Sequence, residues 1–395
     1  MTLTNDAFIL AVNCGSSGLK FGLFGQRDLQ PALNGSVNTD AAGKTHFIIQ
    51  DEQGEFWANH SLVKAGVPAG IRELTGWLHD HQSRYLIGAV VHRIVQGGPV
   101  HRDPELISEG LLRELQHYAY LAPNHIPDEI KAIKAFQEAF PNTKAVACFD
   151  TCFHKNLPDE ARYFPLPEKF RKGGLIRYGF HGLSYEFVLN KLLKKHPKLG
   201  RQKLIIAHLG SGASMTAICN GKSFDTTMGL SPLGGLVMGT RPGDLDPGVI
   251  LYLLRKEKLS ADQIDELLSE QSGLKAIAGC GDMESLVKRS AGDPKAKLAI
   301  SIFSYTVKKN IGALAAAMGG LDMLVFTGGI GENSPVIRSL CCEDLEFIGL
   351  KLNHRRNDKG QQWISKSDSR VKIGVIKTDE AAMMAKHARA LINNL

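Results

Sequence analysis

Two stretches of the chain share one pattern of apolar and polar positions. Residues 8–24 form two apolar, strand-like runs separated by a polar turn that contains glycines, and residues 204–219 repeat this design. Each pattern is typical of a β-hairpin. Aligning Gly15 with Gly210 gives an offset of 210 − 15 = 195 residues, about half of the chain. The match is short, so duplication of a domain and chance similarity are both open at this point.

The rest of the chain alternates between helical and strand-like patterns. Residues 127–140 place Ile130, Ile133 and Phe136 at helical spacing, and Pro127 suits the first turn of a helix. Further helices are predicted after Asp246, from Ser260 onwards and over residues 295–318, and strands over residues 145–149, 323–327 and 371–376. This alternation predicts an α/β fold.

Length and composition indicate more than one domain. The chain has 395 residues, of which 43% are hydrophobic and 22% are charged. It therefore exceeds the roughly 250–300 residues at which one hydrophobic core stops growing. We expect an N-terminal domain over residues 1–150 and a C-terminal, nucleotide-binding domain over residues 151–381, with a helix over residues 382–395 that packs back on the first domain.

Charge and cysteine usage exclude several classes of protein. The net charge is +7, but the basic residues are scattered and form no patch with aromatic residues, so we expect no nucleic acid partner. No apolar run has the pattern of a signal peptide or a membrane span. The chain has seven cysteines, an odd number, and they are scattered along the sequence. This pattern favours reduced thiols over disulfides. We therefore expect a cytoplasmic protein without a membrane partner.

Three glycine-rich segments are suited to binding phosphate groups. The turn at Gly15 and the turn over residues 208–214 can point backbone N–H groups at an anion, but neither has the spacing of a P-loop or a dinucleotide-binding motif. Ordinary turns are an equally good interpretation of both. The third segment, residues 326–335, follows a strand and is expected to enter a helix through Ser334 and Pro335, so that the start of the helix faces an anion.

Two arginines lie within glycine-rich stretches. Arg93 belongs to residues 92–98 and Arg241 to residues 239–248. Surface arginines are usually solvated, but a guanidinium held between glycines also fits a planar anion such as a carboxylate or a phosphoryl group.

Taken together, these segments resemble the acetate and propionate kinase family. The resemblance runs from about residue 9 to residue 385 and includes the stretches VNCGSSGLKF, HRIVQGG, LAPNHIP, FDTCFH, YGFHGLSY, HLGSGAS, GTRPGDLDP, FTGGIGENS and KTDE, in this order. It implies an α/β fold of two duplicated domains, of the actin-like, sugar-kinase-like and ribonuclease H-like type, with the active site in a cleft between them. A homodimer is also implied.

The resemblance assigns roles to residues of this chain. The catalytic residues implied are Arg93, His125, Asp150, His181 and Arg241. The ATP or ADP contacts implied are Ser16, Lys20, His208, Gly210, Ser211, Gly212, Asp282, Met283, Gly329, Gly331 and Asn333. Mg²⁺ or Mn²⁺ would be held by Asn13 and Glu380, and an acyl pocket would be formed by Val95, Asn124, Phe180 and Pro232.

The implied reaction is the reversible transfer of a phosphoryl group from ATP to acetate, in line and without a phosphoenzyme. A carboxylate nucleophile is already ionised at neutral pH and needs no general base. Asn124 stands where the family commonly has a leucine, so propionate or another short acid, including a hydroxylated one, is the alternative substrate. Glu284 stands where a nucleotide-contacting arginine is usual.

Two other classes are also considered. A sugar or alcohol kinase would use Asp150 as a base, but it has no evident need for two arginines at the acceptor. An actin-like or chaperone-like nucleotide-binding module would have no need for them either.

Overall fold

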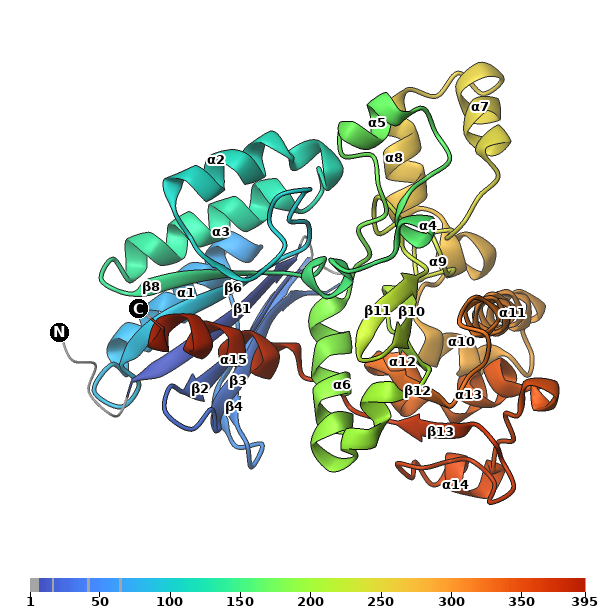
Figure 1. Cartoon of the computed structure of the whole chain (residues 1–395). Coiled ribbons are helices and arrows are strands. Elements are labelled where there is room, and N and C mark those ends of the chain that lie inside the picture. Colours follow the sequence, from blue (N-terminus) through green and yellow to red (C-terminus); the bar gives the residue numbers. More distant parts are fainter. Residues whose placement is uncertain (1–6, 16–17, 41–42, 64–65, 395) are drawn as a thin grey trace. The chain divides into compact units, whose positions relative to one another are not determined.

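The computed structural model describes residues 7–15, 18–40, 43–63 and 66–394 (Figure 1). The chain forms two compact units. Unit 1 comprises Met1–Cys152 and Asp379–Leu395, and unit 2 comprises Phe153–Thr378. Each unit contains one β-sheet with helices packed on it, so the predicted α/β class is confirmed. Glu380 lies in unit 1, whereas the sequence analysis placed it in the C-terminal domain.

The sheet of unit 1 has eight strands in the order β5-β4-β3-β2-β1-β6-β8-β7. Their bounds are β1 Phe8–Gly15, β2 Gly18–Gly25, β3 Pro31–Thr39, β4 Thr45–Asp51, β5 Phe56–Ser61, β6 Ile87–Ile94, β7 Glu105–Leu106 and β8 Lys144–Phe149. The hairpin predicted at the start of the chain is the antiparallel pair of β1 and β2. Strands β1, β6 and β8 are parallel, so their carboxyl ends meet at one edge of the sheet.

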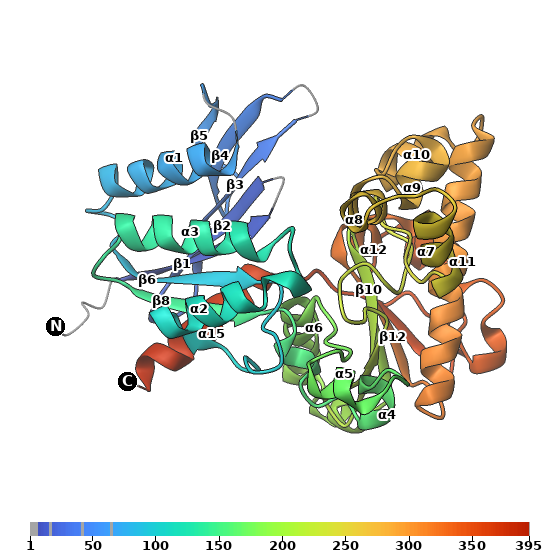
Figure 2. The same cartoon turned by 90° about the horizontal axis from the view of Figure 1, so that it is seen from above.

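Helices cover both faces of this sheet. They are α1 Val67–Asp80, α2 Glu109–His117, η1 Ala119–Leu121, α3 Ile126–Ala139 and α15 Glu380–Asn393. Leu10 and Val12 of β1 pack with Phe136 of α3 on one face. Because side chains alternate along a strand, Ala11 and Asn13 point to the other face, against which α15 lies (Figure 2).

The sheet of unit 2 has five strands in the order β11-β10-β9-β12-β13. Their bounds are β9 Leu204–Leu209, β10 Ala213–Cys219, β11 Lys222–Thr226, β12 Met323–Thr327 and β13 Lys372–Val375. An antiparallel β9–β10 hairpin precedes two strands that run parallel to β9. The order and directions match those of β3-β2-β1-β6-β8 in unit 1, which confirms the duplication that the short repeat alone left open and that the family resemblance implied.

The helices of unit 2 also lie on both faces of its sheet. They are α4 Asp159–Arg162, α5 Glu168–Lys172, α6 Gly182–Lys195, η3 Pro197–Arg201, α7 Pro247–Arg255, α8 Ala261–Glu270, α9 Gly273–Ala278, α10 Met283–Arg289, α11 Pro294–Ala317, α12 Gly328–Asn333, α13 Pro335–Cys342, η4 Glu346–Ile348 and α14 His354–Asp358; η2, Cys152–His154, begins at the last residue of unit 1. Tyr185 and Val188 of α6 pack against Leu204 and Ile206 of β9. Helix α11 lies on the opposite face (Figure 2).

Most predicted elements are confirmed with shifts of one or two residues, including the capping box of Ser260 and Gln263. The prediction for residues 326–335 is wrong in one respect: a short helix, α12, begins at Gly328, before the helix that starts after Ser334. A carboxylate oxygen of Glu332 accepts the N–H of Gly328 at 3.0 Å, which closes this first turn. No helix in the described part of the chain has the length and apolarity needed to cross a membrane.

Candidate active site

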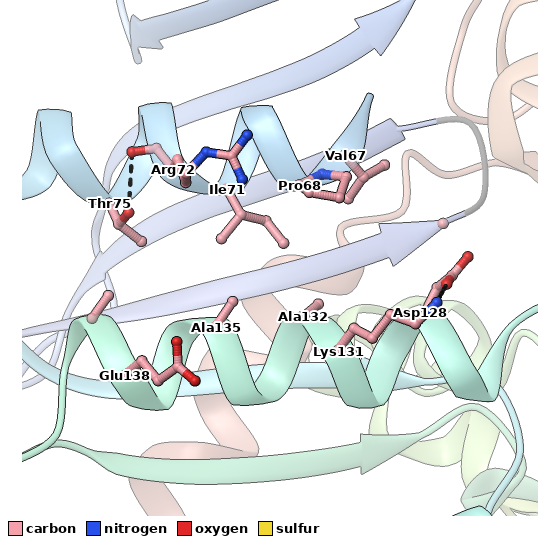
Figure 3. Close-up of a pocket in the computed structure, with 12 residues that line it drawn as sticks. Val67, Pro68, Ile71, Arg72, Thr75, Asp128, Lys131, Ala132, Ala135 and Glu138 are labelled. Carbon is pink, nitrogen blue, oxygen red and sulfur yellow. Dashed lines mark hydrogen bonds and ion pairs between the residues drawn. The ribbon is translucent and has the colours of Figure 1, made fainter. Parts of the chain in front are cut away.

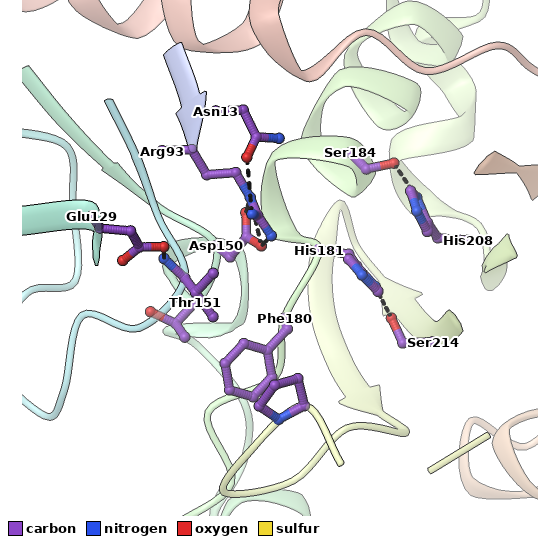
Figure 4. Close-up of polar contacts among 12 residues, drawn as sticks. Asn13, Arg93, Glu129, Asp150, Thr151, Phe180, His181, Ser184, His208 and Ser214 are labelled. Carbon is purple, nitrogen blue, oxygen red and sulfur yellow. Dashed lines mark hydrogen bonds and ion pairs between the residues drawn. The ribbon is translucent and has the colours of Figure 1, made fainter. Parts of the chain in front are cut away.

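Three of the predicted residues form a hydrogen-bonded cluster at the strand ends of unit 1. Arg93 lies near the end of β6, Asp150 directly follows β8, and Asn13 belongs to β1. Arg93 Nε donates to both carboxylate oxygens of Asp150 at 3.1 Å, and its Nη2 donates to one of them as well. Nη1 donates to Asn13 Oδ1 at 3.2 Å (Figure 4). The guanidinium of Arg93 therefore links the ends of β1 and β8.

Glu380 adds a second carboxylate to this cluster. It is the first residue of α15, on the sheet face to which Asn13 points. Burial raises the pKa of Glu380, the negative charge of Asp150 raises it further, and the cations of Arg93 and Lys20 oppose this shift. Lys20 is the cross-strand partner of Asn13 but is exposed, and Ser16 lies outside the described residues.

The cluster fits a magnesium ion that takes part of its coordination from phosphate and water. Asn13, Asp150 and Glu380 supply oxygen atoms, which Mg²⁺ prefers, and the ion usually binds through one or two carboxylates. Among the described residues, no group of three acidic, histidine or cysteine side chains could hold a metal ion by itself. A cation here would relieve the repulsion between the two carboxylates, which contributes to the raised pKa of Glu380.

Glu129 is a buried carboxyl that the sequence analysis missed. It lies in the first turn of α3 and is 3% exposed. One carboxyl oxygen accepts the N–H of Val95 at 3.1 Å (Figure 4), and the other, Oε2, has no hydrogen-bond partner among the described atoms. Its spacing from Ile133 and Phe136 places it on the apolar face of the helix, which could have revealed it.

The burial of Glu129 predicts a pH dependence of stability. Burial raises the pKa of Glu129 from 4.5 to about 8. Between these values the folded state binds a proton that the unfolded state lacks. The stabilisation is therefore complete below pH 4.5 and is lost towards pH 8, at about 1.4 kcal/mol per pH unit. We expect Glu129→Gln to flatten the profile measured by urea denaturation, and identical profiles would contradict the shift.

The remaining predicted residues of unit 1 lie close to Glu129 in the chain or in space. His125 precedes α3, and its carbonyl accepts the N–H groups of Asp128 and Glu129. Val95 is buried, whereas Asn124 is exposed. The hydrogen bond from the N–H of Val95 to Glu129 thus links the backbone at Val95 to the first turn of α3, which follows His125.

In unit 2, two predicted histidines stack on one another. The rings of His181 and His208 are 4.3 Å apart and inclined by 20°. His181 precedes α6 in a left-handed conformation with φ 58°, which is uncommon for a residue with a side chain. Its Nδ1 lies 2.7 Å from Ser214 Oγ, and Nδ1 of His208 lies 2.8 Å from Ser184 Oγ (Figure 4).

Arg241 approaches the turn of the β9–β10 hairpin. Its Nη1 donates to the carbonyl of Pro232 at 2.9 Å. A Cβ added to Gly212 would lie 3.3 Å from Arg241 Nη2 and 3.3 Å from His181 Nε2. The guanidinium and the imidazole therefore converge on the backbone of this turn, an arrangement suited to a phosphoryl group. Phe180, beside His181, is buried.

The predicted nucleotide segments of unit 2 meet at the same turn. A Cβ on Gly210 would lie 4.0 Å from the backbone nitrogen of Gly329, and the N–H of Gly239 donates to the carbonyl of Ser211 at 3.1 Å. A Cβ on Gly239 would in turn lie 3.1 Å from the carbonyl oxygen of Gly281, next to Asp282.

The side chains in these segments mainly support the backbone. Asp282 accepts the N–H of Ser285 as the cap of α10, and Met283 is buried. Asn333 donates to the carbonyl of Gly329 at 2.9 Å, and Gly331 is buried. Their arrangement leaves backbone groups, rather than these side chains, as the candidate ligands of a nucleotide.

A cavity of about 630 Å³ lies elsewhere in unit 1, between α1 and α3 (Figure 3). Its polar lining combines the basic Arg72 and Lys131 with the acidic Asp128 and Glu138. Apart from Gly15 at its edge, none of the segments suited to phosphate contributes to it. The mixed charge shows no preference for an anion, so this cavity is not a candidate for the phosphoryl chemistry.

Comparisons with known proteins agree over almost the whole chain. The sequence model of the acetokinase family matches residues 8–386. The acetate kinase of Nitrobacter hamburgensis is 41% identical over 391 residues, which cover 97% of this chain and 96% of that protein.

Two solved structures are similar in fold as well as in sequence. The propionate kinase of Francisella tularensis has a TM-score of 0.89 at 36% identity, covering 96% of this chain and 98% of that one. The acetate kinase of Porphyromonas gingivalis has a TM-score of 0.86 at 32% identity, covering 98% of this chain and all of that one. These likenesses confirm the expected duplicated, actin-like fold.

Proposed function

The chain belongs to the acetokinase family, and from this membership we propose that it catalyses the reversible, ATP-dependent phosphorylation of acetate to acetyl phosphate. The observation that carries this proposal is the convergence of Arg241 Nη2 and His181 Nε2 on the turn at Gly212. A guanidinium and an imidazole held at a backbone turn are suited to the negative charge of a phosphoryl group in transfer.

The residues of both units support a direct, in-line transfer. The acetate carboxylate needs no base, so the protein has to offset its repulsion from ATP. Arg93 supplies a cation fixed by Asp150 and Asn13, and Arg241 supplies one fixed by Pro232. His181 donates a hydrogen bond to the phosphoryl oxygens. We further propose that Val95, Asn124, Phe180 and Pro232 are the residues that contact the acyl group.

Asn13 and Glu380 would hold Mg²⁺ or Mn²⁺, with Asp150 beside them, and the ion would neutralise the nucleotide phosphates when bound. The backbone of residues 208–212, 282–283 and 329–333 would hold ATP or ADP.

A hydroxamate assay tests the reaction directly. We expect acyl hydroxamate from ATP, Mg²⁺ and hydroxylamine with acetate, because hydroxylamine traps an acyl phosphate. A panel with propionate, a hydroxylated short acid and glucose ranks the acceptors by kcat/KM. Turnover of glucose without turnover of any acid would contradict the proposal, and a higher kcat/KM for propionate would replace acetate as the substrate.

We propose that the protein is a homodimer and that α7 contributes to the interface. No residue of α7 is buried, and Val249, Leu251, Tyr252 and Leu254 are 40% to 54% exposed. Figure 1 shows α7 at the outer edge of its unit. A helix that leaves so much apolar surface exposed is typical of an interaction site.

Sedimentation velocity tests the dimer. We expect the wild-type protein to sediment as a dimer and Leu251→Asp to shift it towards the monomer, because the interface would have to bury a charge. Leu86→Asp, at a half-exposed leucine of unit 1, is the matched control and should leave the dimer intact. A monomeric wild-type protein, or a fully dimeric Leu251→Asp variant, would contradict the proposal.

A cytoplasmic location is proposed as well. None of the seven cysteines is joined in a disulfide, as expected for a reducing compartment.

A further inference from the structure

Helix α6 presents three polar side chains to one end of the sheet of unit 2. His181, Ser184 and Tyr185 occupy positions i, i+3 and i+4, which lie on one face of a helix. Opposite them are His208 and Ser214, which are cross-strand partners in β9 and β10 and therefore point to the same face of the sheet. The helix and the hairpin thus enclose five side chains that can exchange hydrogen bonds.

The first chain of hydrogen bonds runs from Tyr185 through Ser214 to His181. The Tyr185 hydroxyl is hydrogen-bonded to Ser214 Oγ, and Ser214 Oγ lies 2.7 Å from Nδ1 of His181. Both Tyr185 and Ser214 are fully buried. Either hydroxyl could donate in this pair, but a phenol is more acidic than an aliphatic hydroxyl, so Tyr185 is expected to donate to Ser214. The single Ser214 proton is then directed to Nδ1, and the ring proton of neutral His181 resides on Nε2.

The second chain of hydrogen bonds has the opposite direction. Ser184 Oγ donates its only proton to Thr378 Oγ1 at 2.9 Å. It can therefore only accept from Nδ1 of His208, which lies 2.8 Å away. This places a proton on Nδ1 of His208.

We propose that Tyr185 and Ser214 are positioning residues that hold His181 as its Nε2–H tautomer, while Ser184 and Thr378 hold the stacked His208 with its proton on Nδ1. Nε2 of His181, which faces the turn at Gly212 beside Arg241, is then a permanent hydrogen-bond donor. His181 cannot be protonated on Nδ1 without losing the bond that Ser214 donates.

The catalytic consequence of this arrangement rests on the proposed function, because the donor matters only if a phosphoryl group is transferred at this turn. The tautomers themselves do not depend on it. A measurement of the ring protons therefore separates a failure of this inference from a failure of the proposed function.

Long-range ¹H–¹⁵N spectra of the full-length protein labelled with ¹⁵N-histidine distinguish protonated from bare ring nitrogens. His181 and His208 are assigned from the signals lost in His181→Gln and His208→Gln. We expect a bare Nδ1 and a protonated Nε2 for His181, and a protonated Nδ1 for His208. A protonated Nδ1 on His181, or a bare Nδ1 on His208, overturns the inference.

Steady-state kinetics of variants at Ser214 and Tyr185 provide a second test. We expect Ser214→Ala to lower kcat by about tenfold or more, as the loss of a tautomer-fixing partner does elsewhere. The KM values should change by less than about threefold, because the donor acts on the transition state. Tyr185→Phe should show a smaller loss in the same parameter, and both variants should shift the His181 ring signals.

The matched control is Tyr178→Phe. Tyr178 is also a buried tyrosine of unit 2, and its hydroxyl donates to the carbonyl of Gly174 at 2.8 Å. The Tyr178→Phe variant should retain the wild-type kcat and the wild-type histidine ring signals. Ser214→Thr, which keeps the hydroxyl, should recover most of the activity lost in Ser214→Ala. An equal loss in Tyr178→Phe, or unshifted His181 signals in Ser214→Ala, overturns the positioning role.

Discussion

Replacing Arg241 by alanine is expected to lower kcat for acetate phosphorylation by about 10³-fold or more, the range found when a transition-state arginine is absent in other phosphoryl transfers. Nη1 of this side chain is held by the carbonyl of Pro232, so Nη2 is fixed beside Gly212 and His181 Nε2. A prearranged cation stabilises charge in the transition state without reorganisation. Steady-state rates with saturating ATP and acetate measure the loss.

Two further variants separate the charge of Arg241 from its geometry. Arg241→Lys keeps the charge but cannot bond the Pro232 carbonyl and the substrate at once, so we expect it to recover only a minor part of the activity. Arg201→Ala, at an exposed arginine of the same unit, should retain the wild-type rate. An unchanged kcat in Arg241→Ala would remove this residue from the catalytic site.

The local features of this fold could be predicted from the sequence because their signals are local. The strand over residues 323–327 and the helix over 294–317 are set by the periodicity of apolar residues and by caps within a few positions. The glycine turns are recognisable for the same reason. The short repeat alone left duplication open, because the matching order of the two sheets is a property of pairing between distant segments.

The supporting side chains could not be predicted because their partners are far away in the chain. Ser184 and Thr378 are 194 residues apart, and Glu129 meets Val95 across 34 residues. A serine or a threonine has no local pattern that identifies such a partner. Helix α12 was missed for a related reason, since glycines disfavour helices and its first turn is closed by the side chain of Glu332.

Replacing Asp150 by asparagine is expected to reduce both activity and stability. The amide keeps the shape of the side chain but loses the charge that fixes Arg93, and Asp150 is only 1% exposed. Breaking a buried ion pair on one side typically costs about 3–5 kcal/mol, because the remaining charge is uncompensated. The Arg93 side chain is still 17% exposed and stays near Glu380, so its charge is partly compensated. We therefore expect the free energy of unfolding, measured by urea denaturation, to fall by about 2–3 kcal/mol.

The activity of Asp150→Asn distinguishes a catalytic role from a structural one. If Asp150 helps to place Mg²⁺ and the phosphoryl group, kcat should fall by about 10²-fold or more even in the fully folded protein, and the Mg²⁺ concentration for half-maximal rate should rise. Glu380→Ala should show the same Mg²⁺ shift, whereas Asp80→Asn, at the exposed end of α1, should show neither effect. Full activity at low Mg²⁺ in a destabilised Asp150→Asn protein would mean that the pair with Arg93 supports the fold alone. Loss of activity with an unchanged Mg²⁺ requirement would instead assign Asp150 to holding Arg93 against the substrate.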